Sequence, residues 1–189
     1  GCVRPGRGVL AAGAAFGLGS TVWVGVVGGR GRGQHALGRP GGLLPGGYWS
    51  FSQTDASINI GNSGGPLVNA SGRVVGITTA VRSDGQGLAF ATPAAMAERF
   101  LDEARTFGRV RKTHLGINAN DQPNPGTGPG TVVQITKVEA GGPGARADLQ
   151  SGDIILRIDG NPVARVSDVA YMAQLSGVGR KLTLTIRRG

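Results

Sequence analysis

Glycine interrupts this chain at short intervals: 36 of its 189 residues are glycine. The glycines follow no period of three, which excludes a collagen-like triple helix. Because glycine favours tight turns and weakens long helices, we expect many short strands joined by turns. Hydrophobic residues make up 39% and aromatic residues 5% of the chain, low fractions that still suffice for small β-rich cores. The sequence therefore predicts a mainly β fold.

Strand-like runs occupy the first half of the chain, from Val9 to about Phe90. Two of them, STVWVGVVG at 20–28 and GRVVGITTAV at 72–81, are rich in β-branched residues. Between them lies a Gly/Arg/Pro segment, residues 28–47, which predicts a long loop. LAFATP, residues 88–93, predicts one more short strand.

The hydrophobic period changes over residues 92–108, which predicts an amphipathic helix. Thr92 is the expected N-cap, Pro93 the first helical residue and Gly108 the stop. We expect this helix to pack on the preceding barrel and to end a first domain, residues 1–108. Its expected apolar face comprises Met96, Phe100, Leu101 and Ala104, and its polar face comprises mostly Glu98, Asp102, Glu103 and Arg105.

Residues 109–189 predict a second, smaller β-rich α+β domain. Ser167 is expected to cap its second helix and Gly177 to end it. The expected strands are 131–138, 154–158 and 181–187, and the expected helices are 143–149 and 168–176.

The formal charge of +9 raises the question of a nucleic-acid partner. The arginines are scattered through loops without the interleaved aromatic residues that stack on bases, so we expect a solvated basic surface and no nucleic acid. Cys2 is the only cysteine, which excludes an internal disulfide and a cysteine-based metal site; we expect no metal and no cofactor. The chain starts at Gly1 without a targeting signal, so we interpret it as an excerpt or a processed chain.

The hexapeptide GNSGGP, residues 61–66, places a serine in a glycine-rich turn. Glycines let the backbone turn sharply, so that neighbouring amides can face an oxyanion that develops beside the serine. Gly61 and Ser63 are the natural donors of such an oxyanion hole. The same residues are also ordinary hairpin-turn chemistry, and that alternative stays open for the hexapeptide alone.

The residues around this turn resemble the nucleophile region of the HtrA (DegP-like) family of trypsin-fold serine endopeptidases. The resemblance covers 53–80, extends upstream through VLAAGAAFGLGSTVWVGVV and downstream through GLAFATPAAMAERF. It implies the C-terminal half of a trypsin-like double β-barrel. It also implies that Ser63 is the nucleophile and that Gly61, Asn62 and Ser63 form the oxyanion hole. An aliphatic specificity pocket is implied at Ile58, Val81 and Leu88.

In this family the triad histidine and aspartate come from the first barrel, which we expect upstream of Gly1. The chain has two histidines, His35 in the 28–47 loop and His114 at the start of the second domain. Neither lies in the context that the family's catalytic histidine has. Asp55 belongs to a motif with a supporting role in the family. We therefore expect the 189 residues alone to be inactive.

HLGI, residues 114–117, resembles the carboxylate-binding loop of PDZ domains in bacterial HtrA proteins, and SGDIILRIDGNPV at 151–163 is a further PDZ signature. The resemblance implies that the amides of Leu115, Gly116 and Ile117 hold a peptide C-terminus, while the peptide adds as a strand. Val169 and Met172 are candidates for the pocket of its last side chain; plain core packing is the alternative.

The sequence thus predicts an HtrA-type serine endopeptidase that acts on misfolded or unfolded proteins and binds peptide C-termini through one PDZ domain. By family analogy we expect a trimer-based homo-oligomer and an extracytoplasmic location. The alternative is a non-catalytic PDZ peptide-binding or chaperone-like protein. A third class, a basic nucleic-acid binder, would show DNA binding that weakens steeply with salt.

Overall fold

Strands predominate in this computed structural model, which describes residues 3–14, 19–33, 50–59, 61–81, 87–124 and 130–189. The chain divides into two units, Gly1–Val110 and Arg111–Gly189. Each unit has its own sheet and its own hydrophobic core. The prediction of a mainly β chain is confirmed.

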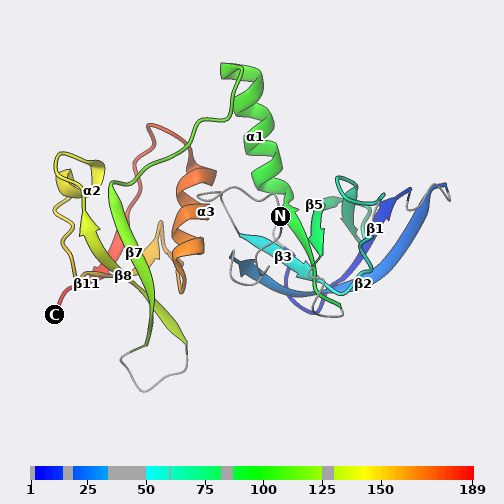
Figure 1. Cartoon of the computed structure of the whole chain (residues 1–189), viewed down its shortest axis with the longest axis horizontal. Coiled ribbons are helices and arrows are strands. Elements are labelled where there is room, and N and C mark those ends of the chain that lie inside the picture. The colour runs from blue at the N-terminus through cyan, green and yellow to red at the C-terminus, as the bar shows by residue number, and fades with distance from the viewer. Residues whose placement is uncertain (1–2, 15–18, 34–49, 60, 82–86, 125–129) are drawn as a thin grey trace. The chain divides into compact units, whose positions relative to one another are not determined.

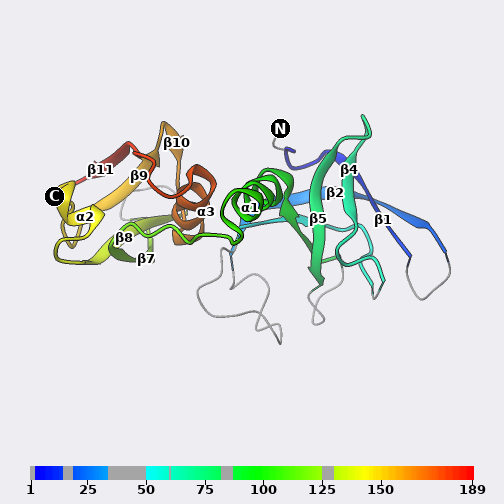
Figure 2. The same ribbon diagram turned by 90° about the horizontal axis from the view of Figure 1, so that it is seen from above.

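The first unit is built on a closed six-stranded antiparallel barrel in the order β1-β2-β3-β6-β5-β4 (Figures 1 and 2). Pairing of β1 with β4 closes the barrel. Closure leaves no sheet edge exposed, so that every strand has two partners. The strands are β1 (Gly8–Gly13), β2 (Thr21–Arg32), β3 (Phe51–Thr54), β4 (Pro66–Asn69), β5 (Val74–Val81) and β6 (Ala89–Pro93).

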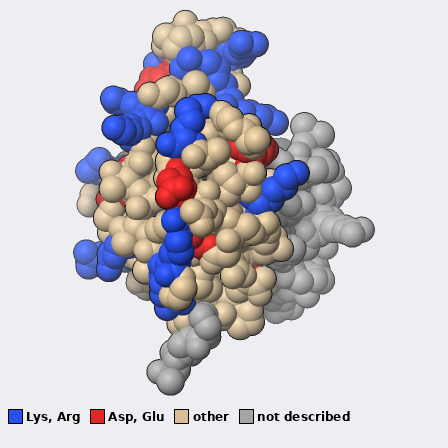
Figure 3. All heavy atoms as spheres, turned by 90° about the vertical axis from the view of Figure 1, so that its left-hand side faces the viewer, with Lys and Arg blue, Asp and Glu red and all other residues tan. Residues whose placement is uncertain are grey.

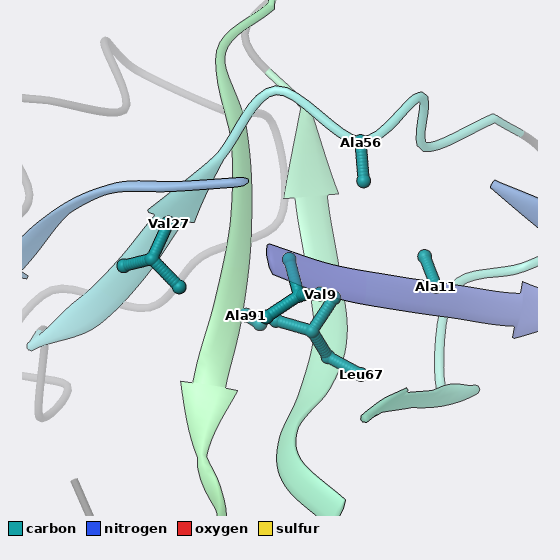
Figure 4. Close-up of a cluster of buried hydrophobic side chains, with 6 residues drawn as sticks. All are labelled: Val9, Ala11, Val27, Ala56, Leu67 and Ala91. Atoms are coloured by element: carbon teal, nitrogen blue, oxygen red, sulfur yellow. The ribbon is translucent and has the colours of Figure 1, made fainter. Parts of the chain in front are cut away.

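Small side chains fill much of the barrel interior. Figure 4 shows the buried cluster, in which residues from different strands point toward one another. Trp23 packs against this cluster from β2, while the alternating valines of the same strand face solvent. The cluster comprises Val9, Ala11, Val27, Ala56, Leu67 and Ala91.

Helix α1 (Ala94–Phe107) follows β6 and packs against β5 and β6. Gly108 ends it with a left-handed backbone (φ 66°), as predicted. The prediction of Thr92 as N-cap is wrong, because Pro93 occupies that position without a side-chain cap. Thr92 belongs to β6, and its hydroxyl lies 2.9 Å from the Thr79 hydroxyl on β5.

The expected faces of α1 are also partly wrong. Met96 is buried as predicted, but Leu101 is 54% exposed and Ala104 is exposed as well. Glu103, expected on the polar face, is buried and pairs with Arg99 one turn earlier at 2.5 Å. An ion pair of this kind lets a carboxylate occupy a buried position that sequence periodicity assigns to solvent.

The second unit is a five-stranded sheet with two helices. The strands follow the order β10-β9-β8-β7, and β11 pairs with β9 along residues 154–158. Val133, Ile135, Ile155 and Ile158 form the centre of its core. Its elements are β7 (Ile117–Pro123), β8 (Thr131–Val138), α2 (Pro143–Arg146), β9 (Ile154–Ile158), β10 (Asn161–Pro162), α3 (Val166–Ser176) and β11 (Leu184–Arg187).

Three element boundaries in this unit differ from the prediction, one of them the start of β11, which lies at Leu184 and not at residue 181. Helix α3 begins at Val166, so Ser167 lies inside it and is not its cap. The Asp168 carboxylate accepts a hydrogen bond from the Arg165 amide at 3.0 Å and satisfies that end of the helix. Gly177 follows the last helical residue, as predicted. Helix α2 ends at Arg146, three residues earlier than expected.

Basic side chains are dispersed on the face that Figure 3 shows, with neutral and acidic side chains between them. Within the described residues, no helix is long and apolar enough to cross a membrane. Nor do the described residues contain a cluster of three or more His, Cys, Asp or Glu that could hold a metal ion.

Candidate active site and peptide-binding site

Ser63 lies exposed in the turn that precedes β4, whereas Asn62 beside it is fully buried. The Asn62 side chain holds the turn through both ends of its amide. Its Nδ2 donates to the Ser57 carbonyl at 3.1 Å, and its Oδ1 accepts from the Asn59 amide at 3.0 Å. Because the oxygen and the nitrogen of this buried side-chain amide are both hydrogen-bonded, they fix the backbone on which Ser63 lies.

Strand β5 supports the same turn through Thr78, which is buried. The Thr78 hydroxyl lies within hydrogen-bonding reach of the Asn62 carbonyl and of the Gly65 carbonyl. The Gly64 amide donates to the Thr78 carbonyl at 2.7 Å, and the Thr78 amide donates to the Gly65 carbonyl at 2.9 Å. The turn is therefore bonded to the barrel wall on both sides of Ser63.

Strand β1 packs against the turn so closely that two positions admit only glycine. A β-carbon on Gly13 would lie 2.5 Å from the Asn62 Cα, and one on Gly65 would lie 2.2 Å from the Ala12 carbonyl oxygen. The Ala14 amide donates to the Gly61 carbonyl at 3.2 Å. Close backbone contact of this kind is a recurring reason for glycine in a strand.

The predicted oxyanion-hole donors are the amides of Gly61 and Ser63. Gly61 has a left-handed backbone with φ 105°, which favours glycine there. Its carbonyl is engaged by Ala14. In the part of the chain that the structure describes, no protein group accepts a hydrogen bond from the Gly61 or Ser63 amide. Their role as oxyanion-hole donors stays a prediction.

The three predicted pocket residues differ in exposure. Ile58 is buried, Leu88 is half-buried and Val81 is 44% exposed. All three are aliphatic, and none of the three could pair with a basic substrate side chain. Their assignment to one specificity pocket stays a prediction.

We predicted that neither histidine of the chain serves as a base for Ser63, and that Asp55 is not the triad acid. His35 lies outside the described residues. His114 lies in the second unit, where its Nε2 is 2.7 Å from the Glu139 carboxylate. Asp55 accepts a hydrogen bond from the Val26 amide at 2.6 Å, a supporting contact between β2 and the segment after β3. Among the described residues, no side chain hydrogen-bonds to the Ser63 hydroxyl.

In the second unit, the loop before β7 turns its carbonyls toward Glu139 and α2. The Leu115 carbonyl accepts from the Gly144 amide at 2.8 Å, and the Gly116 carbonyl accepts from the Glu139 amide at 2.9 Å. A trans peptide unit directs its carbonyl and its N–H to opposite sides, and the described chain has no cis peptide. The amides of Gly116 and Ile117 therefore point away from Glu139 and Gly144.

Strand β7 continues from this loop and pairs with β8 along one edge, while helix α3 contacts β7 (Figure 1). Leu115 and Ile117 pack half-buried against the same cluster that contains buried Val169 and half-buried Met172. The fold thus brings together all the apolar residues that we assigned to peptide binding. Val169 is part of the core, so the core-packing alternative holds for it at least in part.

Two family models match the chain, each over one unit. The trypsin model matches residues 23–101, and the PDZ domain model matches residues 134–188. The putative serine protease HhoB of Synechocystis sp. is 36% identical over 99% of this chain and 47% of its own length. The periplasmic serine endoprotease DegP of Escherichia coli is 34% identical over 98% of this chain and 39% of its own length. The structure of the HtrA-type protease AlgW with a tripeptide aligns at a TM-score of 0.65 and 34% identity, over 98% of this chain and 62% of that one.

The chain is HtrA-like, with a trypsin-type barrel followed by a PDZ domain. It spans about half the length of HhoB and less of DegP.

Some residues that build the sites of this HtrA-like chain were not predicted. The role of Gly13 could have been inferred from the sequence, because a lone glycine within a strand often marks close backbone contact. The role of Thr78 could not, since a threonine in a β-branched run is expected in any strand. Gln174 lies on α3 and is fully buried, although glutamine is usually exposed.

Proposed function

We propose that this chain is the nucleophile-bearing part of an HtrA-type serine endopeptidase that acts on unfolded proteins. The observation that carries the proposal is the exposed Ser63 on a turn fixed by Asn62, Thr78 and Gly13, while the Gly61 and Ser63 amides have no acceptor among the described residues. The match to HtrA-type proteases along 98–99% of the chain supports it.

In the proposed mechanism, the Ser63 hydroxyl attacks the scissile carbonyl and forms a tetrahedral intermediate. The Gly61 and Ser63 amides stabilise the oxyanion of this intermediate, a contribution that commonly amounts to about 2.7–4 kcal/mol per donor. Its collapse breaks the C–N bond, releases the amine fragment with the proton taken from Ser63 and leaves an acyl-enzyme that water hydrolyses. A base must take the Ser63 proton and a third group must orient that base. We assign the base and the group that orients it to the part of the protease fold that lies outside these 189 residues. The 189 residues alone are therefore inactive.

The full-length protein tests the proposal through its cleavage products. Casein digested by the wild-type protein should yield fragments that end mostly in Val, Ala or similar residues, because Ile58, Val81 and Leu88 offer only aliphatic surface. Ser63→Ala should lower the rate by at least about 10³-fold. An unchanged rate would remove Ser63 as nucleophile. Fragments ending mainly in Arg or Lys would refute the pocket assignment.

The second unit is proposed to bind peptide C-termini at the β7–α3 site, by which we mean residues 115–117, strand β7 and helix α3. The outward amides of Gly116 and Ile117 would donate hydrogen bonds to the carboxylate, and the peptide would add along the β7 edge. The AlgW structures with a tripeptide and with a decapeptide support peptide binding in relatives of this fold.

A non-catalytic peptide-binding or chaperone-like role is the second candidate. One observation favours it: no described side chain hydrogen-bonds to the Ser63 hydroxyl. This role predicts peptide binding by the full-length protein without any Ser63-dependent cleavage. A trimer-based assembly and an extracytoplasmic location remain proposals; the latter is supported by relatives named as periplasmic proteases.

A further inference from the structure

The β7–α3 site is tied together by hydrogen bonds at both ends of helix α3. At the end of α3, buried Gln174 bonds to the segment before β7. At its start, the Val166 amide donates to the Asp121 carboxylate on β7 at 2.7 Å. Where β7 and α3 are joined by a direct hydrogen bond, no further strand can lie between them. An added peptide strand therefore fits only between the Asp121–Val166 bond and the Gln174 bonds.

Gln174 uses both ends of its side-chain amide. Its Oε1 accepts from the Thr113 amide at 3.0 Å and from the Thr113 hydroxyl at 3.1 Å. Its Nε2 donates to the Arg111 carbonyl at 3.0 Å. The side chain is 1% exposed, so water cannot readily replace these bonds.

Thr113 lies two residues before Leu115, the first residue of the loop proposed to bind a carboxylate. The loop is held from its other side by Glu139 and Gly144. Gln174 is therefore the contact that fixes the start of the loop to the helix.

We propose that Gln174 is a positioning residue for recognition of the peptide carboxylate. It holds residues 111–113 on α3 and so keeps the Gly116 and Ile117 amides aimed at the carboxylate. Asp121 has a separate role: its hydrogen bond from Val166 fixes the spacing between β7 and the start of α3. This inference rests on the proposed peptide-binding function.

The test measures affinities of the 189-residue chain for a hexapeptide ending in Val, as free acid and as C-terminal amide. Wild type should prefer the free acid by about tenfold or more. Gln174→Met keeps the size of the side chain but removes the three hydrogen bonds, and should lower this preference by about fivefold. Gln174→Glu keeps the acceptor for Thr113 and should fall between the two.

Two controls separate positioning from general damage. Gln150→Met makes the same exchange at an exposed site and should leave the preference unchanged. Asp121→Ala should weaken both peptides by a similar factor, because it acts far from the carboxylate, and Asp121→Asn should restore affinity, since its amide oxygen can still accept from Val166. Circular dichroism at the assay temperature verifies that each variant is folded.

The outcomes distinguish this inference from the function on which it rests. A wild-type chain that binds both peptides equally, or neither, overturns the proposed function together with this inference. A wild-type chain that prefers the free acid, with the same preference in folded Gln174→Met and Gln174→Glu, overturns the inference alone.

Discussion

At Gly13 the end of β1 comes so close to the serine turn that a β-carbon would lie 2.5 Å from the Asn62 Cα. The neighbouring atom is backbone and cannot rotate away. We expect Gly13→Ala to destabilise the first unit by about 1–3 kcal/mol through overpacking. Urea unfolding followed by tryptophan fluorescence reports this, because Trp23 packs against the barrel cluster and residues 111–189 contain no tryptophan.

Gly8 provides a matched control on the same strand. A β-carbon at Gly8 would have no neighbour within 4 Å, so Gly8→Ala should be neutral or slightly stabilising. Equal stabilities of the two variants would show that the close contact between Gly13 and Asn62 does not constrain the turn.

Asp153 and Arg188 form the main charged pair of the second unit. The Arg188 Nε donates to the Asp153 carboxylate at 2.7 Å, and this carboxylate is buried. The hydrogen bond from Arg188 is the main cause that lowers the pKa of Asp153, and it outweighs the opposing effect of burial. A lowered pKa in the folded state means that the pair stabilises the fold above the ordinary carboxyl pKa of about 3.9. That stabilisation is lost as the pH falls below this value.

We therefore expect Arg188→Met to destabilise the second unit at pH 7 more than Arg187→Met, its neighbour without a described ion pair. The difference should shrink between pH 5 and pH 2 because protonated Asp153 gains little from arginine. Urea unfolding followed by far-ultraviolet circular dichroism measures it at each pH. A difference that stays constant with pH would contradict the role given to this pair.

At the scale of single elements, the proposed carboxylate-binding role of the loop before β7 can be tested directly. A peptide with a free C-terminus should bind the 189-residue chain more tightly than its amidated form by about 1.5–3 kcal/mol, the usual value of a hydrogen bond to a charged group. Calorimetric titration with matched peptides ending in Val gives both affinities. Equal affinities would leave the Leu115–Ile117 loop without a carboxylate-binding role.

Much of the element pattern could be predicted from the sequence because turns and strand periods are local. Strands β8 and β9 have the expected bounds, and Gly108 and Gly177 end their helices as expected. The serine turn and the loop before β7 were also recognisable, since their residues match specific family motifs.

The misplaced features depend on contacts between elements. Thr92 was expected to cap α1 but belongs to β6, where its hydroxyl meets Thr79. Glu103 is buried because Arg99 pairs with it, a contact that periodicity does not register. Gln174 bonds to Thr113 across 61 residues, a separation at which local patterns carry no information.

At the scale of the whole molecule, the chain combines a trypsin-type barrel with a PDZ domain and covers about half of relatives such as HhoB. The Ser63 turn is fixed by contacts within its own unit, and the peptide site is fixed by contacts within the other. We therefore propose that this chain displays the nucleophile and binds the peptide, and that groups outside it activate Ser63.

Peptide release from casein by the 189-residue chain tests that division most directly. Ser63→Ala serves as the reference, and binding of a free-acid peptide by the same samples verifies that the chain is folded. We expect wild type to release no more peptide than Ser63→Ala, although both bind the peptide. Release by wild type that Ser63→Ala abolishes would contradict this expectation, because a base for Ser63 would then lie within these 189 residues, with His35 as the first candidate.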